Sequence, residues 1–265
     1  MELGEYFGKV FGKVFNGTIY WPTLVLMIIL GVVMCIVGVI LFFTVGTSVV
    51  TSLMSAYSDP ALLANTSALS TIILSLLGAM TGVLVVLGIF ALVITYLSHV
   101  IYAFVVIRIQ ATEGKAKSLG FFEGLGTAFG RGFKLFIACL IYMIVIGIVM
   151  LIVWLLSLIP IAGFILAILL SIVIMLYAIT GMWVLVGSIG SGESFGKSLG
   201  QAFAKPFTKG KLWLYTLLFL LILGVISTIA SLIAMIPLLG WIAYLFIIVG
   251  TYIFAAAIAY FYAKE

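Results

Sequence analysis

Residues 135–192 read LFIACLIYMIVIGIVMLIVWLLSLIPIAGFILAILLSIVIMLYAITGMWVLVGSIGSG and contain no aspartate, glutamate, lysine or arginine. One crossing of a bilayer needs only about 20 apolar residues, so this stretch is long enough to cross twice. Pro160 lies near its middle, and Gly163 follows three residues later. Proline lacks the N–H that a helix interior requires, and a nearby glycine permits a tight reversal. The stretch therefore predicts a transmembrane hairpin.

Three further stretches lack acidic and basic residues, at 14–58, 60–107 and 212–263, and the last contains a second pair, Pro237 and Gly240. The runs are continuously apolar rather than alternating, which favours helices over a barrel. We expect an all-α polytopic membrane protein that forms a single membrane domain, 1–265. Its six transmembrane helices are predicted at about 20–45, 83–107, 135–158, 162–187, 212–235 and 241–262.

Composition excludes several classes of protein. Hydrophobic residues make up 66% of the chain and charged residues only 7%, whereas a soluble domain carries about 25% charged residues. This excludes a soluble enzyme, a nucleic-acid binder, a disordered tail and a disulfide-stapled secreted domain. Cys35 and Cys139 both fall inside predicted spans, where we interpret them as packing residues.

The basic residues predict the orientation. All twelve Lys and Arg fall in the N-terminal segment, in 108–134, in 197–211 or at Lys264. With six spans, all of these segments lie on one face of the membrane. The positive-inside rule assigns this face to the cytoplasmic side of a cell membrane, so both termini are expected in the cytoplasm. The opposite face carries Asp59 and a glycosylation sequon at Asn65.

Three short segments repeat one pattern: FGKVFGKVF at 7–15, LGTAFGRGF at 125–133 and LGQAFAKPF at 199–207. Each precedes an odd-numbered span. The chain is therefore predicted to contain three pseudo-repeats, at about 1–112, 113–190 and 191–265. Each would consist of an interfacial amphipathic helix followed by a transmembrane hairpin.

Within these segments, aromatic residues recur every four positions with cations beside them, as expected of helices in the cytoplasmic interface. We expect the cations to attract anionic headgroups of membrane lipids. The candidate lipid-contact residues are Phe7, Lys9, Phe11, Lys13, Phe15, Phe129, Arg131, Phe133, Lys134, Phe203, Lys205 and Phe207.

Small residues form a second stripe in the same segments, at Gly4, Gly8 and Gly12, at Gly126 and Gly130, and at Gly196, Gly200 and Ala204. We expect this stripe to touch a neighbouring span or repeat. The alternative is that the segments are irregular loops, above all the third, which contains Pro206.

The first hairpin has a long outer connection, at about 46–82, in which serine and threonine recur at helical spacing. It predicts a helical hairpin that turns at Asp59-Pro60. Its hydroxyls either line a polar pathway or face water on a structural cap. The candidate pathway residues are Ser48, Ser52, Ser55 and His99, the one ionisable residue within the span cores. His99 is otherwise a hydrogen-bonded packing residue.

The sequence lacks Gly-x-Ser-x-Gly, His-Glu-x-x-His, paired intramembrane acids and a phosphate-binding loop. We therefore expect no catalytic, cofactor or metal site, although a lipid-modifying enzyme stays open. The first functional hypothesis is a membrane scaffold or accessory subunit, as a homo-oligomer or in a membrane-protein complex. The second is a passive pore or carrier for an uncharged or apolar solute.

A Phe-Gly-rich amphipathic segment ahead of each of three hairpins resembles a loose group of six-span membrane-protein families of unknown function. It is also similar to the membrane domain attached to some glycerophosphodiester phosphodiesterases. The catalytic barrel of those enzymes has no counterpart in this sequence, so the resemblance implies the membrane fold and not the activity.

Overall fold

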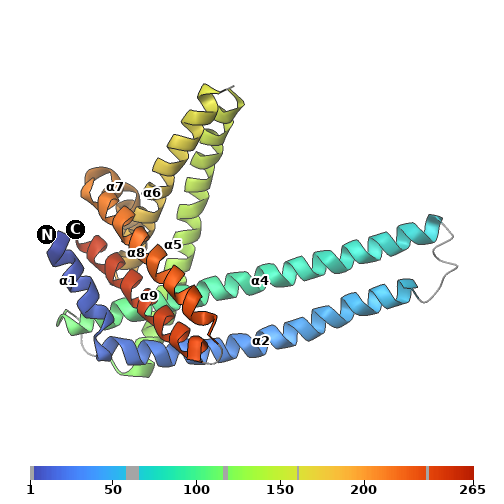
Figure 1. Ribbon diagram of the computed structural model, residues 1–265, viewed down its shortest axis with the longest axis horizontal. Coiled ribbons are helices and arrows are strands. Elements are labelled where there is room, and N and C mark those ends of the chain that lie inside the picture. The colour runs from blue at the N-terminus through green and yellow to red at the C-terminus, as the bar shows by residue number, and fades with distance from the viewer. Residues whose placement is uncertain (1–2, 58–65, 116–118, 160, 237–238) are drawn as a thin grey trace. The chain divides into compact units, whose positions relative to one another are not determined.

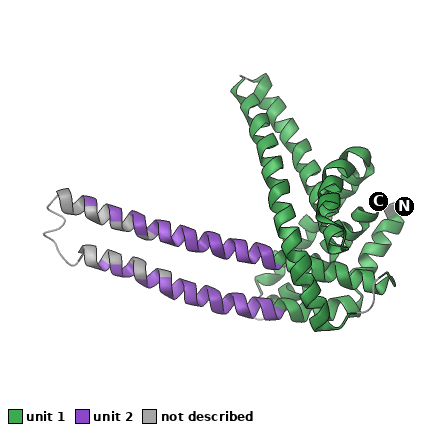
Figure 2. Cartoon of the chain, turned by 180° about the vertical axis from the view of Figure 1, so that it is seen from behind, with its two compact units in different colours: residues 1–27, 98–265 green, residues 28–97 purple. Residues whose placement is uncertain are grey.

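The computed structural model describes residues 3–57, 66–115, 119–159, 161–236 and 239–265, and its elements are helices (Figure 1). Contacts divide the chain into two units (Figure 2). Residues 1–27 and 98–265 form the first, called the core unit below, and residues 28–97 form the second, called the hairpin unit.

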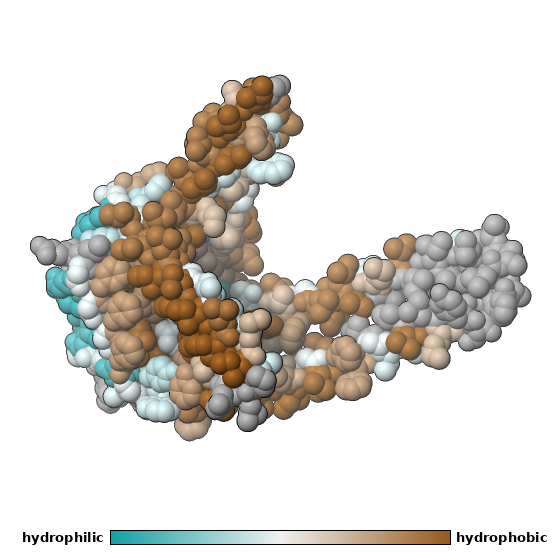
Figure 3. Space-filling model, in the orientation of Figure 1, coloured by the Kyte–Doolittle hydropathy of each residue, from teal (hydrophilic) through white to brown (hydrophobic). Residues whose placement is uncertain are grey.

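Six helices are long and apolar enough to cross a membrane, which confirms the predicted all-α polytopic fold. They are Gly17–Thr44, Met80–Thr112, Phe121–Leu158, Ala162–Gly190, Lys211–Ala234 and Gly240–Lys264. Figure 3 shows apolar residues over the helices and hydrophilic residues gathered at the end of the core unit where the two termini lie. We call this end the basic end.

The helices are grouped here by the three predicted repeats. Repeat 1 contains α1 (Leu3–Val14), α2 (Gly17–Tyr57) and α4 (Thr66–Thr112). Repeat 2 contains α5 (Phe121–Leu155), the 3-10 turn η1 (Leu156–Leu158) and α6 (Ala162–Gly190). Repeat 3 contains α7 (Phe195–Thr208), α8 (Lys211–Ala234) and α9 (Leu239–Lys264).

Both predicted reversals occur, between η1 and α6 and between α8 and α9. Their glycines serve close approach rather than an unusual backbone angle. A Cβ at Gly163 would collide with the carbonyl oxygen of Leu156, and one at Gly240 with that of Ile233. Each glycine therefore lets a helix start directly against the end of its partner.

One predicted boundary is wrong. The amphipathic segment of repeat 2 is not a separate interfacial helix, because α5 runs without a break from Phe121 through the third span. In repeats 1 and 3 a glycine follows the segment, Gly17 or Gly210, and a new helix starts there. Repeat 2 has Lys134-Leu135 at this point, and both residues favour a helix, so α5 continues.

In the hairpin unit, α2 and α4 continue as helices through the predicted outer hairpin, to Tyr57 and from Thr66 (Figure 2). The predicted turn at Asp59-Pro60 and the sequon at Asn65 lie outside the described residues.

Candidate functional site

The second helices of the three hairpins, α4, α6 and α9, meet inside the core unit. A Cβ at Gly190 of α6 would lie 3.0 Å from the side chain of Val106 of α4. One at Gly187 would collide with the backbone of Ala259 of α9. The rings of Tyr102 and Tyr252 join α4 to α9 at 5.0 Å between centroids. Glycine and aromatic contacts thus hold these three helices together.

The repeated segments of repeats 2 and 3 pack on the second helix of the repeat before them, which is α4 or α6. The segment of repeat 1, α1, packs on α9, the second helix of repeat 3. The contacts therefore connect the three repeats in a closed ring. Three pairs illustrate this: Tyr6 of α1 donates to the carbonyl of Ile258 of α9 at 3.3 Å, Gly132 of α5 lies against Val100 of α4, and Tyr177 of α6 donates to the carbonyl of Phe203 of α7 at 2.8 Å.

The buried face of the segments is the same in all three repeats. We number each nine-residue motif (7–15, 125–133 and 199–207) from its first residue. The buried face contains the residue before each motif and the fourth residue of each motif: Tyr6 and Val10, Gly124 and Ala128, Ser198 and Ala202. The predicted glycine stripe is instead exposed. A Cβ at Gly8, Gly126 or Gly200 would meet no atom of this chain within 4 Å. The expected contact of this stripe with a neighbouring span or repeat is therefore wrong within one chain.

The seventh motif residue is a cation in every repeat, and it is half-buried each time. Lys13 donates to the hydroxyl of Thr112 at 3.0 Å, Arg131 to the carbonyl of Gly190, and Lys205 to the carbonyls of Tyr262 at 3.2 Å and Ala263. In each case the acceptor lies in the last turn of the second helix of the same repeat. We call Lys13, Arg131 and Lys205 the clasp residues.

The last carbonyls of a helix have no partner within it and carry partial negative charge, so a cation there is favourable. The clasp residues supply this cation, and for Lys205 burial lowers the pKa of the amine. These three predicted headgroup ligands thus have partners within the protein. Lys9, which pairs with Glu5 at 2.6 Å, and Lys134 are the exposed cations of the predicted set.

The predicted aromatic residues divide in a similar way. Phe15, Phe133 and Phe207 hold the ninth motif position and are 83%, 58% and 76% exposed. They are therefore available to lipid. Phe7 packs on Phe219, Phe203 packs on Tyr142, and Phe11 and Phe129 are about one third exposed.

Glu113 forms a charged cluster just after α4. Tyr260 and Lys264 donate to its carboxylate at 3.0 and 2.6 Å, and Lys13 and Lys115 lie 3.6 and 3.5 Å away. Burial acts to raise the pKa of Glu113, but the hydrogen bonds from Lys264 and Tyr260 and the nearby positive charges lower it to about 2. The carboxylate ties repeat 1 to the end of α9.

The predicted pathway residues fall in different units. His99 belongs to the core unit, where its ring lies edge-on to Phe136 at 6.0 Å. Ser48, Ser52 and Ser55 lie on α2 in the hairpin unit, and their side chains are outside the described part of the chain. Within the hairpin unit, the described threonine hydroxyls of α2, those of Thr44, Thr47 and Thr51, donate to carbonyls of their own helix.

Among the described residues, no group of three His, Cys, Asp or Glu could hold a metal ion. Cys35 is exposed and Cys139 is buried, and neither forms a disulfide. Comparison of the chain with family models, curated proteins and solved structures gives no match. The resemblance to the membrane domain of phosphodiesterases stays a prediction.

Proposed function

We propose that the protein is a non-catalytic membrane scaffold that associates with a second copy of itself through its hairpin unit. The basic end would face the cytoplasm of a cell membrane, because all predicted cation-rich segments fall on that side. Lys9, Lys134 and the exposed phenylalanines would contact lipid there.

The length of α2 and α4 supports this proposal. They contain 41 and 47 residues, about twice the number that one crossing needs. Far along both helices, apolar side chains stay exposed: Val50 at 54%, Met54 at 65%, Leu74 at 69% and Leu77 at 54%. Beyond the hydrocarbon, such side chains need another apolar surface. Every copy presents the same faces, so a symmetric pairing of hairpins satisfies both partners.

Cysteine cross-linking in native membranes tests the association. In a Cys35→Ala background, Val50→Cys is expected to form a disulfide-linked dimer on oxidation. Trp154→Cys is the matched control, because Trp154 is 71% exposed on α5 of the core unit. A monomer in native mass spectrometry, together with equal cross-linking of the two variants, would refute the proposal.

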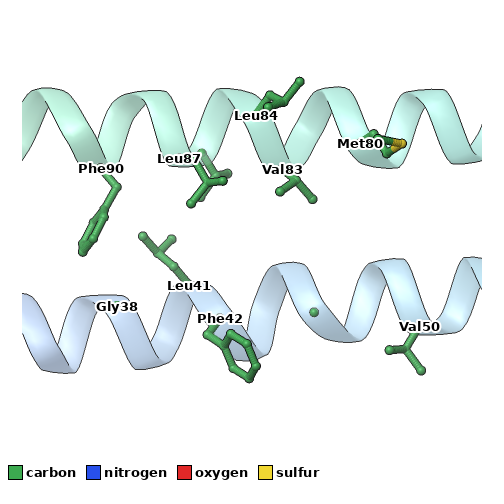
Figure 4. Close-up of a pocket in the computed structure, with 11 residues that line it drawn as sticks. Gly38, Leu41, Phe42, Val50, Met80, Val83, Leu84, Leu87 and Phe90 are labelled. Carbon is green, nitrogen blue, oxygen red and sulfur yellow. The ribbon is translucent and has the colours of Figure 1, made fainter.

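A second candidate is a carrier for an apolar solute. Within the hairpin unit, α2 and α4 border a partly open space of about 600 Å³ that is lined by apolar side chains and glycines. Figure 4 shows Leu41, Leu87 and Phe90 directed into this space. Drug-sized ligands occupy pockets of about 300–1,000 Å³. An aqueous pore would need a polar lining, so an apolar carrier is the version that we retain.

Filling the space tests the carrier. A Cβ at Gly38 would lie 3.6 Å from the ring of Phe90, whereas one at Gly31 would meet no atom of this chain within 4 Å. Gly38→Leu is expected to abolish binding of a fluorescent fatty acid, and Gly31→Leu to preserve it. Equal binding by both variants would exclude this space as the site.

A further inference from the structure

Arg108 differs from the other half-buried cations. Four described Lys and Arg residues are half-buried, namely the three clasp residues and Arg108. Each clasp residue donates to an oxygen at a helix end. The Arg108 guanidinium forms no hydrogen bond or ion pair with any described residue, and its Nε–H is shielded from solvent without an acceptor. A buried donor without an acceptor is unfavourable and is uncommon in native proteins.

The guanidinium lies between the end of α4 and the first turn of α5. Its central carbon is 5.0 Å from the centroid of the Phe104 ring. Its Nη2 would be 3.8 Å from a Cβ at Gly124. The corresponding residues of the other repeats, Tyr6 and Ser198, fill this place with a buried side chain. Repeat 2 alone has a glycine here, and it leaves room for the guanidinium.

The surroundings indicate the chemistry of the missing acceptor. Arg108 lies four residues before the end of Met80–Thr112, the second helix that is long and apolar enough to cross a membrane, at the basic end. Phe122, on the adjacent turn of α5, is 84% exposed. The one carboxylate in this turn, on Glu123, is exposed and is not paired with Arg108. At such a boundary the abundant anion is phosphate, which a planar guanidinium binds through two parallel hydrogen bonds.

We propose that Arg108, supported by Phe104 and Gly124, is a binding site for the phosphate group of an anionic phospholipid or of free phosphate. The Phe104 ring supports the guanidinium by a cation–π contact, and Gly124 leaves the space beside Nη2 free of a side chain. The site belongs to the core unit and does not depend on the proposed association of hairpins.

Native mass spectrometry of delipidated protein in mild detergent tests the site, with phosphatidylglycerol and phosphatidylcholine as probes. Arg108→Gln is expected to weaken phosphatidylglycerol binding about tenfold or more, since charge-assisted hydrogen bonds are lost. Lys209→Gln removes an equal charge from an exposed position just after α7, outside the predicted lipid-contact set, and is expected to bind the lipid as the unchanged protein does. Equal affinity of Arg108→Gln and the unchanged protein, for both lipid and free phosphate, would overturn the proposal.

A second pair of variants keeps the arginine. Gly124→Leu is expected to fill the space beside the guanidinium and to lower binding to the same extent. Gly126→Leu, where a Cβ meets no atom of this chain within 4 Å, is expected to have no effect. Equal binding by these two variants would also contradict the site.

A third measurement distinguishes the source of the phosphate. Sodium phosphate is compared with sodium chloride at equal ionic strength, in detergent without lipid, by the Tm of the protein. A rise in Tm that Arg108→Gln abolishes assigns the site to free phosphate. An effect of phosphatidylglycerol without an effect of inorganic phosphate assigns it to the lipid. Absence of both effects overturns it.

Discussion

The contact between α5 and α4 at Gly132 can be tested with a single methyl group. A Cβ at this position would lie 2.8 Å from Cγ2 of Val100 and 2.9 Å from its Cα. Ordinary contact begins at 3.4 Å, so Gly132→Ala requires a shift of about 0.5 Å against a backbone atom that cannot rotate away. Overpacking of this kind costs about 1–3 kcal/mol. The alanine also recovers about 1 kcal/mol of helix propensity.

Gly130→Ala provides the matched control, because it lies on the same helix and its Cβ would meet no atom of this chain within 4 Å. Both variants gain the same propensity, so their difference isolates the steric cost. We expect Gly130→Ala to exceed Gly132→Ala by about 1–3 kcal/mol in free energy of unfolding. Circular dichroism during an SDS titration in mixed micelles measures this difference. Equal stability of the two variants would refute the close packing of α5 on α4.

Two further predictions concern the basic end. Lys205→Met leaves the last carbonyls of α9 without their donor and is expected to lower the free energy of unfolding by about 1–3 kcal/mol. Lys209→Met, at an exposed position, is expected to change it by less than about 0.5 kcal/mol in the same titration. Because the folded-state pKa of Glu113 is about 2, below its usual 4.5, its contribution is complete above about pH 4.5 and is lost as the pH falls towards 2. Glu113→Gln should therefore have a lower Tm than the unchanged protein at pH 7 and an equal Tm near pH 2, whereas a constant difference would contradict the carboxylate cluster.

The spans and reversals could be predicted because they depend on local composition. Apolar runs longer than two crossings must fold back, and Pro160 and Pro237 mark where. The buried face of the repeated segments was missed, because the phenylalanines dominate the pattern. Val10, Ala128 and Ala202 occupy the same motif position, and this shared small or apolar residue is the signal that identifies the buried face.

The partners of the clasp residues could not be predicted from the sequence. Their prediction requires knowing which helix end lies beside each repeated segment, and spacing along the chain does not give this information. One signal was present nevertheless. The seventh motif residue is a cation in every repeat, whereas Lys9 has Thr127 and Gln201 as its counterparts. A charge that recurs in all repeats satisfies a partner that also recurs, which here is a helix end. Arg108 has no recurring counterpart, so the repeat pattern gave no reason to single it out.

The packing of α1 on α9 has a consequence for biosynthesis. Tyr6 and Ile258 of α9 are 252 residues apart, so α1 leaves the ribosome long before the helix that covers it. Until α9 is synthesised, α1 must remain on the membrane surface as an amphipathic helix. Insertion of α9 is therefore the event that fixes α1 in its folded position.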